Sequence, residues 1–337
     1  MSIAAGNNFN MKFKVLLIGA GKMAGIADIA TSQVPRSHAQ GIKLQSSLSL
    51  AAVVDPVGSA REEFSKRHGC SAFESLGEAL RKENPDVVCI CSPNETHANY
   101  LLELAKLSRP PKLIIVEKPL CTDLKQLRQI QQTKFPCPVV VNQTRRFRKD
   151  MTRLRDFLLS EPFGKIVGAR FVYYGGWVVN AVHAIDQFRF LTGCELSKPQ
   201  IFSAIPSRAH DFLLEGRATI IQNGTDLGVV KFDTVDESHF QLFELELRYQ
   251  NGRIFCRNFA SEIHVETVTT NEIGERELTP QNQSFSDSAE MPIMALYAQA
   301  ARFLAGEVTE RELTSSLDEN LPTMITLLST LEEVARC

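Results

Sequence analysis

Short, unbroken apolar runs alternate with segments of helical periodicity through the first half of the chain. A run such as Val15-Leu16-Leu17-Ile18 is typical of a strand covered on both faces, whereas apolar residues at helical spacing indicate a helix with one buried face. The expected strands are residues 13–18, 48–55, 86–91, 113–117 and 139–142. The expected helices are residues 22–30, 60–68, 75–83, 97–107 and 123–132, and residues 35–41 are expected to form a loop insertion. This alternation predicts an α/β domain with a doubly wound parallel sheet.

The pattern changes from Val167 onward, where apolar and polar positions alternate. The expected strands are residues 166–174, 227–233, 240–249 and 253–259, with Asn251-Gly252 as the hairpin turn between the last two. A helical tract follows at residues 289–304 and 321–335. We therefore expect two domains, residues 1–143 and 144–337. The second is expected to be an α+β domain with a mostly antiparallel open sheet, whose C-terminal helix packs back on the first domain.

Composition agrees with this division and excludes several classes of protein. The chain has 337 residues, of which 44% are hydrophobic, enough for two cores. Its formal net charge of −2 gives no basic face, which argues against a nucleic-acid partner. No apolar run approaches the roughly 20 residues that cross a bilayer, and the polar residues 1–10 lack the hydrophobic core of a signal peptide. We therefore expect a soluble, cytoplasmic protein.

The eight cysteines include no Cys-x-x-Cys pair. Cys89 and Cys91 fall on one face of an apolar strand, where free thiols behave as small hydrophobic groups. We therefore predict reduced thiols and no bound metal.

A glycine-rich turn, Gly19-Ala20-Gly21-Lys22-Met23-Ala24, follows the first expected strand. In a dinucleotide-binding turn the first glycine permits the bend, the second lets the backbone approach a pyrophosphate, and a small residue such as Ala24 packs helix against strand. The N-terminus of the following helix would then attract the phosphate charge. Glycines also end strands for steric reasons alone, so the turn is a weak signal by itself. Together with the sheet pattern it predicts a Rossmann-type cofactor site at Gly19, Gly21, Lys22, Met23 and Ala24.

Asp55 stands at the end of the second expected strand. A carboxylate there would accept hydrogen bonds from the adenine ribose hydroxyls and repel a 2′-phosphate. No arginine follows immediately, because the next residues are Pro56-Val57-Gly58-Ser59. The sequence therefore favours NAD over NADP. The spacing from the turn exceeds the usual value of about 20 residues, and the surplus falls in the loop expected at residues 35–41.

Polar residues also follow a central expected strand, in the segment Ser92-Pro93-Asn94 with His97 shortly after it. The carboxyl ends of parallel strands form the ligand edge of such a sheet, so Ser92, Pro93 and Asn94 are predicted to contact the cofactor. Asn94 would serve equally well as a helix cap. His97 is interpreted either as a residue that begins a helix or as a contact near the nicotinamide ribose.

Glu117-Lys118-Pro119 follows the next apolar run, and the proline restricts the Lys118 backbone to extended shapes. A lysine at a buried strand end is costly unless it binds an anion or titrates. Beside an oxidised nicotinamide ring its pKa would fall from about 10.4, which suits a general acid or base. A solvated lysine or a salt bridge to a carboxylate is the structural alternative. Glu117 and Lys118 are included in the predicted cofactor site.

A helix is expected near residues 180–191, ended by Thr192-Gly193. Val182, Ile185, Phe188 and Leu191 form its apolar stripe, and Asn180, His183, Asp186 and Gln187 form a neighbouring polar face. His183 is therefore a candidate catalytic residue beside Lys118, although a lone histidine at a helix start is more often a structural hydrogen-bonding group. Asp186 is expected either to orient His183 or to favour the helix N-terminus by its charge.

Several residues are candidates for substrate contact. Arg145 and Arg146 follow the last strand of the first domain and would suit an anionic substrate such as a nucleotide-sugar diphosphate, or they form a solvated basic turn. Tyr173, Tyr174 and Trp177 are either a sugar-stacking platform or core of the second domain. The predicted substrate contacts are Asn180, Arg145, Arg146, Tyr174 and Trp177.

Taken together, these motifs resemble the Gfo/Idh/MocA family, the relatives of glucose-fructose oxidoreductase and inositol dehydrogenase. The resemblance rests on the glycine turn, Asp55, the segment from Ser92 to His97, Glu117-Lys118-Pro119 and the helix near His183. It implies a two-domain enzyme whose C-terminal open sheet builds homodimers or homotetramers. It also implies that Lys118 and His183 flank the reacting hydroxyl. The family often has Asp four residues before the histidine, where this chain has Val179, and Asn180 resembles the Asn of some relatives linked to surface-polysaccharide pathways.

The expected function is an NAD(P)-dependent dehydrogenase acting on the CH–OH group of a sugar, cyclitol or nucleotide sugar, with NAD as the favoured cofactor. Hydride would pass between the nicotinamide and a carbon bearing a secondary hydroxyl or ketone, while Lys118 and His183 handle the hydroxyl proton in an order that the sequence leaves open. The alternative is a catalytically idle NAD-binding sensor or regulator of the same fold, since fold alone does not determine function.

Overall fold

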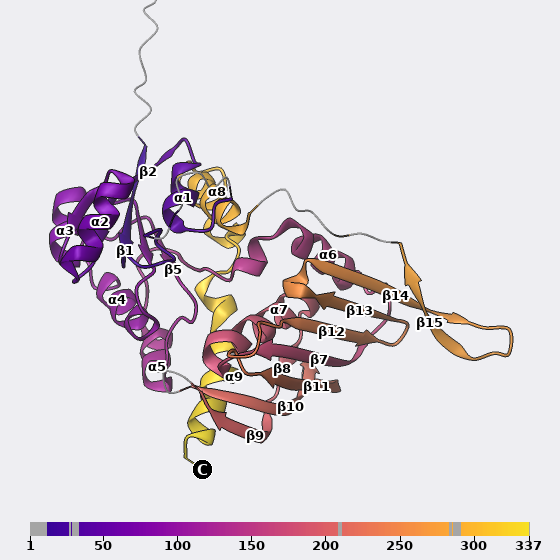
Figure 1. Cartoon of the computed structure of the whole chain (residues 1–337). Coiled ribbons are helices and arrows are strands. Elements are labelled where there is room, and N and C mark those ends of the chain that lie inside the picture. The colour runs from indigo at the N-terminus through magenta and orange to yellow at the C-terminus, as the bar shows by residue number, and fades with distance from the viewer. Residues whose placement is uncertain are drawn as a thin grey trace, which may run out of the picture.

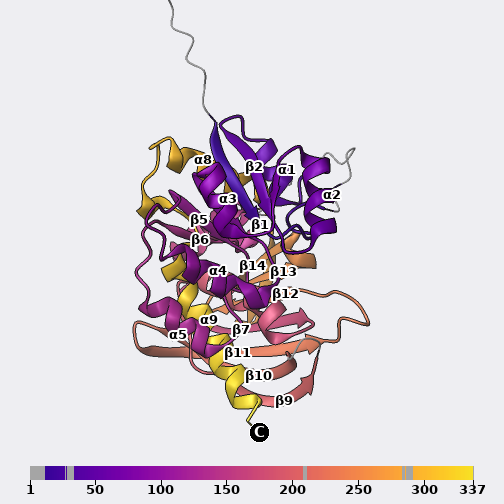
Figure 2. The same ribbon diagram turned by 90° about the vertical axis from the view of Figure 1, so that its left-hand side faces the viewer.

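The computed structural model describes residues 12–26, 28, 34–207, 211–282, 285 and 291–336. The chain forms an α/β domain from its first half and a larger sheet domain from its second half (Figure 1). The C-terminal segment returns from the second domain to the first before it ends along the second (Figures 1 and 2).

The N-terminal sheet has six strands, all parallel, in the order β3-β2-β1-β4-β5-β6. The strands are β1 (Phe13–Ile18), β2 (Leu48–Val54), β3 (Ser71–Phe73), β4 (Val87–Ile90), β5 (Leu113–Val116) and β6 (Val139–Val141). The predicted doubly wound fold is confirmed, and each predicted strand agrees within one residue at either end. The short β3 was not predicted, because its first two residues are polar or small and only Phe73 is buried.

Helices flank this sheet close to their predicted positions. They are α2 (Gly58–His68), α3 (Leu76–Glu83), α4 (His97–Leu104) and α5 (Leu124–Gln132), with a 3₁₀ turn, η1 (Asn94–Thr96), before α4. Asp123 caps α5 by accepting from the Gln126 N–H.

The segment after the glycine turn differs from the prediction. Residues 22–26 form turns, whereas a helix was expected at residues 22–30; residues 27 and 29–33 lie outside the described part of the chain. A helix instead occupies His38–Lys43 (α1), which overlaps the stretch 35–41 that was predicted to be a loop. Ser37 caps α1, and Ala39 and Ile42 bury their side chains in the core that α8 (Pro292–Leu304) completes. The stabilising partner is about 250 residues away in the sequence, so local periodicity could not reveal this helix.

The C-terminal domain contains a nine-stranded sheet that is antiparallel except where β7 pairs with β11. Its strands are β7 (Ile166–Tyr174), β8 (Glu195–Leu196), β9 (Gln200–Pro206), β10 (Phe212–Gln222), β11 (Thr225–Val235), β12 (Glu244–Tyr249), β13 (Gly252–Arg257), β14 (Glu262–Thr270) and β15 (Arg276–Gln281). This confirms the predicted mostly antiparallel sheet. The hairpin β14–β15 projects away from the molecule (Figure 1).

One face of this sheet is buried and the other is open. The helices α6 (Lys149–Leu159), α7 (Val182–Thr192) and α9 (Leu317–Val334) pack together on the buried side, where the rings of Phe171 and Phe188 lie 5.6 Å apart. Val229 and the ion pair between Arg170 and Asp233 lie on the opposite face.

The predicted turn between β12 and β13 is one residue out of position. Tyr249 pairs with Gly252, so the central residues of the turn are Gln250 and Asn251 rather than Asn251 and Gly252. Gly252 is buried, and a Cβ on it would lie 2.5 Å from the Phe163 ring, so this glycine serves close packing. Residues 240–243, predicted as strand, lie before β12 begins.

The C-terminal segment contributes to both domains. The helix α8 packs on α1, and the stretch before α9 extends the first sheet, where the Val141 N–H donates to the Ser315 carbonyl at 2.9 Å. The helix α9 then lies against α5 (Figure 2) and against α7 (Figure 1). A boundary at residue 143 therefore separates the two sheets but does not separate the tail from the first domain.

Candidate active site

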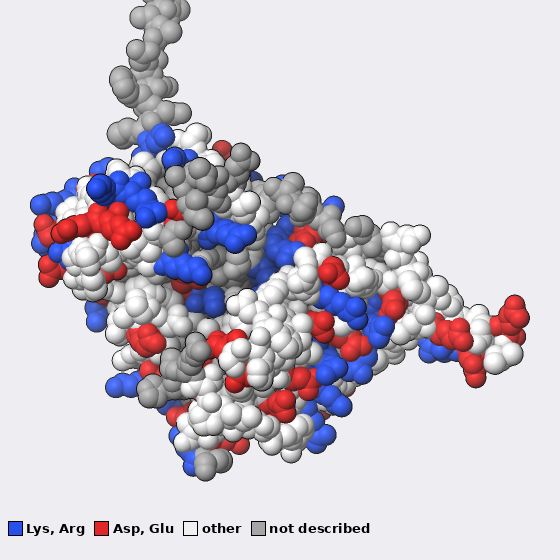
Figure 3. Space-filling model, in the orientation of Figure 1, with Lys and Arg blue, Asp and Glu red and all other residues white. Residues whose placement is uncertain are grey.

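The carboxyl ends of the parallel strands face a hollow between the two domains. Figure 3 shows Lys and Arg side chains gathered in this hollow. The glycine turn after β1, Asp55 after β2, Ser92 after β4, Lys118 after β5 and Arg145 after β6 all lie at this edge of the sheet.

The two glycines of the turn have different roles. Gly19 has a φ of +101°, and a Cβ on it would lie 2.7 Å from the backbone of Ser92, so close packing against the segment after β4 requires glycine here. A Cβ on Gly21 would meet nothing within 4 Å. Gly21, Lys22 and Met23 are exposed, whereas Ala24 is buried against the sheet. The turn therefore has a fixed base and an open upper surface, which fits the approach of a dinucleotide.

Asp55 is half-buried, and its carboxylate is tied to the turn. Its Oδ2 accepts from the Ala20 N–H at 2.8 Å and its Oδ1 accepts from the Val57 N–H at 2.9 Å. Each oxygen keeps a lone pair for a ribose hydroxyl. The sequence analysis missed Arg61, whose guanidinium lies 3.3 Å from the Asp55 carbonyl and 3.1 Å from the Pro56 carbonyl because α2 brings it back to this strand end.

His97 has a structural role in this fold. Its ring is fully buried, with Nδ1 2.8 Å from the Pro119 carbonyl oxygen and Nε2 2.8 Å from the Ser92 carbonyl oxygen. Both ring nitrogens thus contact backbone carbonyls and join the segments that follow β4 and β5. This structural role replaces the predicted contact with the cofactor. Ser92 and Asn94 are half-buried at the same edge, and Pro93 is exposed.

Glu117 also differs from its prediction as a cofactor contact, because it is buried beneath the site. Its Oε1 accepts from Asn142 Nδ2 at 2.6 Å and lies 2.9 Å from His38 Nε2. The other ring nitrogen of His38 lies 2.8 Å from the hydroxyl of Tyr297, in α8. We call His38, Glu117, Asn142 and Tyr297 the buried polar cluster. No local signal marked His38, since its partners lie far along the chain.

The buried polar cluster contains an ion pair. Burial acts to lower the pKa of His38, but contact with Cys89 and Glu117 outweighs it and raises that pKa from 6.5 to about 10. Burial opposes the charge on Glu117 as well, yet His38 and Asn142 lower its pKa below 4.5. Because both shifts favour the charged forms, His38 and Glu117 form an ion pair across neutral pH. Glu117 therefore supports the strand end from which Lys118 projects.

Lys118 reaches across the hollow to the second domain. Its Nζ donates to the Val179 carbonyl at 3.0 Å, and the side chain is half-buried. Burial lowers its pKa below 10.5 and Arg145 adds to this effect, while Glu117 opposes it. This lysine therefore bridges the two domains. Among the described residues, no carboxylate contacts its ammonium group.

His183, in the first turn of α7, lies within the field of the same charges. Burial, Lys118 and Arg145 together lower its pKa well below 6.5, so the imidazole is neutral at neutral pH. Burial, followed by the charge of Arg148, lowers the pKa of Arg145 to about 10. Lys118, Arg145 and His183 thus converge in one place, and a neutral imidazole lies beside two cations.

The turn before α7 holds a carboxylate that the sequence did not identify. Residues Trp177–Ala181 form one π-helical turn, and Asp211 accepts the Val178 N–H at 3.0 Å and the Val179 N–H at 3.2 Å. A Cβ on Gly176 would lie 2.1 Å from Asp211, so the approach requires glycine. Val179 therefore offers its carbonyl to Lys118 while Asp211 holds its N–H. Asn180 is buried in the same turn.

Two of the three aromatic residues that were interpreted as a stacking platform or as core belong to the core. Trp177 is fully buried and donates from Nε1 to the Leu327 carbonyl at 3.0 Å, so it belongs to the core between the sheet and α9. Tyr173 is likewise core. Tyr174 is half-buried, with its ring 5.9 Å from that of Phe259, and stays a candidate.

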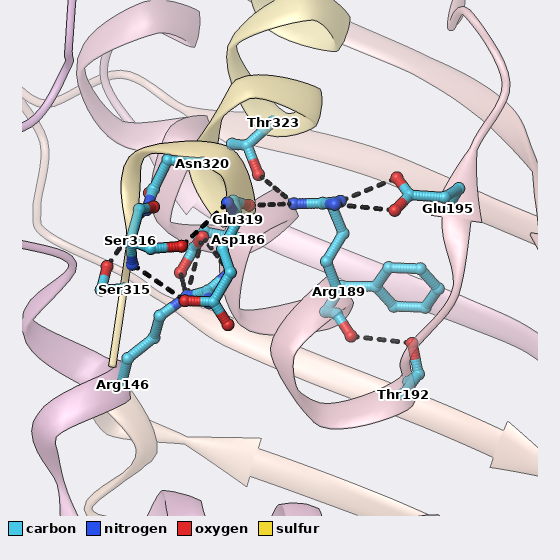
Figure 4. Close-up of polar contacts among 11 residues, drawn as sticks. Arg146, Asp186, Arg189, Thr192, Glu195, Ser315, Ser316, Glu319, Asn320 and Thr323 are labelled. Carbon is cyan, nitrogen blue, oxygen red and sulfur yellow. Dashed lines mark hydrogen bonds and ion pairs between the residues drawn. The ribbon is translucent and has the colours of Figure 1, made fainter. Parts of the chain in front are cut away.

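Arg146 points away from the hollow into an ion-pair network (Figure 4). It is 4% exposed and binds both carboxylate oxygens of Asp186 on α7, and its Nη1 lies 3.2 Å from Glu319 of α9. Arg189 continues the network to Glu195 and to the Glu319 carbonyl. This corrects the predicted substrate role of Arg146. It also replaces both roles considered for Asp186, because its carboxylate neutralises a buried guanidinium.

Within the described ranges, the seven cysteines are free, and no three His, Cys, Asp or Glu side chains group in a way that could hold a metal ion. None of the helices seen there is long and apolar enough to span a bilayer.

Comparison with known proteins identifies the class of this fold. Residues 13–135 match the family model described as "Oxidoreductase family, NAD-binding Rossmann fold" (GFO_IDH_MocA). The rhizopine catabolism protein MocA of Rhizobium meliloti is 24% identical over 200 residues, 55% of this chain and 58% of that protein. The myo-inositol 2-dehydrogenase of Thermotoga maritima is 26% identical over 143 residues, 42% of each chain. The chain thus spans about half the length of the curated relatives that it matches.

The similarity of fold extends over the whole chain. The WlbA dehydrogenase of Bordetella pertussis, solved with NADH and UDP-GlcNAcA, superposes with a TM-score of 0.73 over 96% of each chain at 14% identity. Residues 13–135 are thus similar to the NAD-binding Rossmann domain of the Gfo/Idh/MocA oxidoreductase family, and the two-domain fold of the whole chain is similar to that of the solved dehydrogenase.

Proposed function

We propose that this protein is an NAD(P)-dependent dehydrogenase that oxidises a secondary hydroxyl, or reduces the matching ketone, of a sugar, cyclitol or nucleotide sugar. The observation that supports this most strongly is the convergence of Lys118 and His183 at the ligand edge of a dinucleotide-binding sheet. A bound dinucleotide would supply a hydride acceptor or donor at C4 of its nicotinamide ring.

The residues at the sheet edge fit such a cofactor. The open backbone at Gly21 leaves room for a pyrophosphate, and Asp55 has acceptor capacity for the ribose hydroxyls. Ser92 and Asn94 lie between that end of the site and Lys118. The Asp55 carboxylate would repel a 2′-phosphate, so we propose NAD as the preferred cofactor.

The charges of the site support one assignment of the proton-transfer roles. The depressed pKa of His183 leaves its imidazole neutral, so His183 would accept the hydroxyl proton during oxidation. The ammonium group of Lys118 would stabilise the developing alkoxide by donating a hydrogen bond. In ketone reduction Lys118 would stabilise the same alkoxide, and the protonated form of His183 would donate its proton to the oxygen.

We also propose a cytoplasmic homodimer or homotetramer assembled through the open face of the C-terminal sheet. Exposed apolar side chains on this sheet, among them Val167, Phe202 and Val229, would be covered in such an assembly. Size-exclusion chromatography with light scattering would test it; a monomer at micromolar concentration would contradict it.

The test of function is calorimetric titration with NAD and NADP, followed by an absorbance assay of the reduced nicotinamide over a panel of sugars, cyclitols and UDP-sugars. Tighter NAD binding and turnover of one class are expected. Binding without turnover of any member would favour the alternative, a regulator that senses NAD. Failure to bind either dinucleotide would exclude both.

A further inference from the structure

Arg145 has a positive charge with no anionic partner among the described residues. The two other arginines of its short segment are both paired: Arg146 with Asp186, and Arg148 with Asp150 and with the carbonyl of Phe259 at 2.9 Å. Arg145 instead lies over the ring of Phe243, with its guanidinium carbon 3.9 Å from the ring centroid. Among the described residues its N–H groups at the planar edge have no acceptor, so this half-buried guanidinium is incompletely compensated.

The surroundings of Arg145 increase this excess of positive charge. Arg148 lowers the pKa of Arg145, and Arg145 in turn lowers the pKa of Lys118, so the three cations lie near one another. Among the described residues, the groups that act in the opposite direction on Arg145 are Tyr174 and the already paired Asp186. The hollow seen in Figure 3 is lined by Lys and Arg in agreement with this balance.

The pyrophosphate of a bound dinucleotide would lie too far away to be the anionic partner of Arg145. It would bind at the turn after β1, whereas Arg145 follows β6, and β4 and β5 lie between them in the sheet. Three strand spacings correspond to roughly 14 Å. Arg145 instead adjoins Lys118, at the end where the reacting carbon would lie. The oxidised nicotinamide ring would bring further positive charge to this end.

We propose that the substrate carries an anionic group, a carboxylate or a phosphate, and that Arg145 binds it next to the reacting hydroxyl. This inference rests on the proposed function and narrows its substrate class to sugar acids, phosphorylated sugars and comparable polyhydroxy anions. A planar guanidinium fixed on Phe243 presents its free edge to two oxygens at once, which suits such a group. Arg145 is then a determinant of specificity.

The test uses the full-length protein with NAD and four probes: D-glucuronate, D-glucose 6-phosphate, D-glucose and myo-inositol. Calorimetry is expected to give anionic probes a Kd roughly 10- to 100-fold lower than neutral ones. Whichever anionic probe binds more tightly identifies carboxylate or phosphate as the recognised group. Arg145→Gln is expected to remove this advantage while leaving the affinity for the neutral probes unchanged. Arg145→Lys, which keeps charge but loses the planar edge, is expected to restore only part of it.

The matched control is Arg257→Gln. Arg257 also lies over a phenylalanine ring, at 4.5 Å from the centroid of Phe255, but it is exposed on β13 outside the hollow. This variant should bind all probes as the wild type does. Equal affinity for anionic and neutral probes, equal weakening of both by Arg145→Gln, or no anionic binding at concentrations on the order of 10 mM would overturn the proposal.

Binding and turnover separate this proposal from the proposed function. Selective anion binding by a chain that turns over no substrate would contradict hydride transfer and leave the anion site intact. Turnover of neutral cyclitols or sugars without any preference for anions would contradict the anion site and leave the proposed hydride transfer intact.

Discussion

At the scale of single residues, three basic side chains that lie close together decide the chemistry of the site: His183, Lys118 and Arg145. Burial lowers the pKa of His183 and of Lys118, Arg145 lowers both further, and Lys118 also lowers the pKa of His183. His183 therefore loses its proton at lower pH than Lys118. Neutral histidine next to charged lysine is the combination that hydroxyl oxidation requires.

The pH profile of kcat/KM should show this order. For oxidation, activity is lost as pH falls through the His183 pKa, which lies well below 6.5, and is lost again as pH rises through the Lys118 pKa, which lies below 10.5. His183→Asn should remove the acidic limb and lower kcat/KM by about 10²–10⁴. An acidic limb that persists unchanged in this variant would exclude His183 as the base.

Lys118→Met should lower kcat by roughly 100-fold or more while the Kd for NAD changes little. Because Lys118 also contacts the Val179 carbonyl, this substitution should weaken the contact between the two domains as well as the stabilisation of the alkoxide. Lys118→Arg keeps the charge and separates the two effects: partial rescue of kcat supports the electrostatic role. Unchanged turnover in Lys118→Met would remove the residue from the mechanism.

At the scale of secondary-structure elements, the π-helical turn Trp177–Ala181 leads into α7 and contacts the N-terminal domain through Lys118. A backbone carbonyl, not a side chain, contacts Lys118 there, and Asp211 at the start of β10 fixes the turn through two N–H groups. The family resemblance leads one to expect Asp at position 179. In this chain a carboxylate does bind the same turn, but it comes from a distant strand.

Asp211→Asn tests this positioning role. An amide offers one acceptor atom and turns its NH₂ group toward backbone donors, so the variant should lose roughly 1.5–3 kcal/mol of unfolding free energy. If the turn positions the Val179 carbonyl, kcat should also fall and the alkaline limb of the pH profile should move, since the surroundings of Lys118 change. Urea denaturation and pH–rate profiles measure the two effects.

The matched control is Asp226→Asn, at an exposed position of β11. It should alter neither unfolding nor the profile. A loss of stability in Asp211→Asn with an unchanged alkaline limb would limit Asp211 to a structural role.

At the scale of the whole molecule, two polar networks join segments that are remote in the sequence. The buried polar cluster connects α1, the end of β5 and α8, whereas the network of Arg146, Asp186 and Glu319 connects the exit from β6 with α7 and α9 (Figure 4). Both lie beneath or beside the hollow, so the site and the tail of the chain are stabilised together.

The His38–Glu117 pair should make stability depend on pH. The folded-state pKa of His38 is raised to about 10, so its contribution is fully present below pH 6.5 and is lost as pH rises toward 10. The pKa of Glu117 is lowered, so its contribution is present above pH 4.5 and is lost on acidification. His38→Gln should cost roughly 3–5 kcal/mol at pH 6, because it leaves Glu117 buried without its cation.

Urea unfolding at pH 6 and pH 9 measures this dependence, and the difference between wild type and His38→Gln should shrink at the higher pH. His264→Gln is the control, since His264 is an exposed histidine 3.9 Å from Glu262. A difference that does not change with pH would mean that His38 is uncharged in the folded protein.

The sequence by itself determined the parallel sheet and the residues that lie at its ligand edge. Apolar runs fix parallel strands locally, and residues that follow them reach one edge by topology alone, so Gly21, Asp55 and Lys118 were predicted to lie together. Tertiary structure decided what local patterns cannot encode. Local patterns suggested functional roles for four residues whose side chains instead bind distant partners in the fold: His97, Glu117, Arg146 and Trp177.

The same reason explains what the sequence analysis missed. The helix α1 exists because α8 buries its apolar side, and Asp211 acts on a turn 32 residues away in the chain. Adjacent Arg145 and Arg146 are identical in type, but the fold pairs Arg146 with a carboxylate and lays Arg145 over the ring of Phe243, with no anionic partner among the described residues. Periodicity and motif spacing report short-range order, whereas the pairing of buried charges depends on which distant segments the completed core brings into contact.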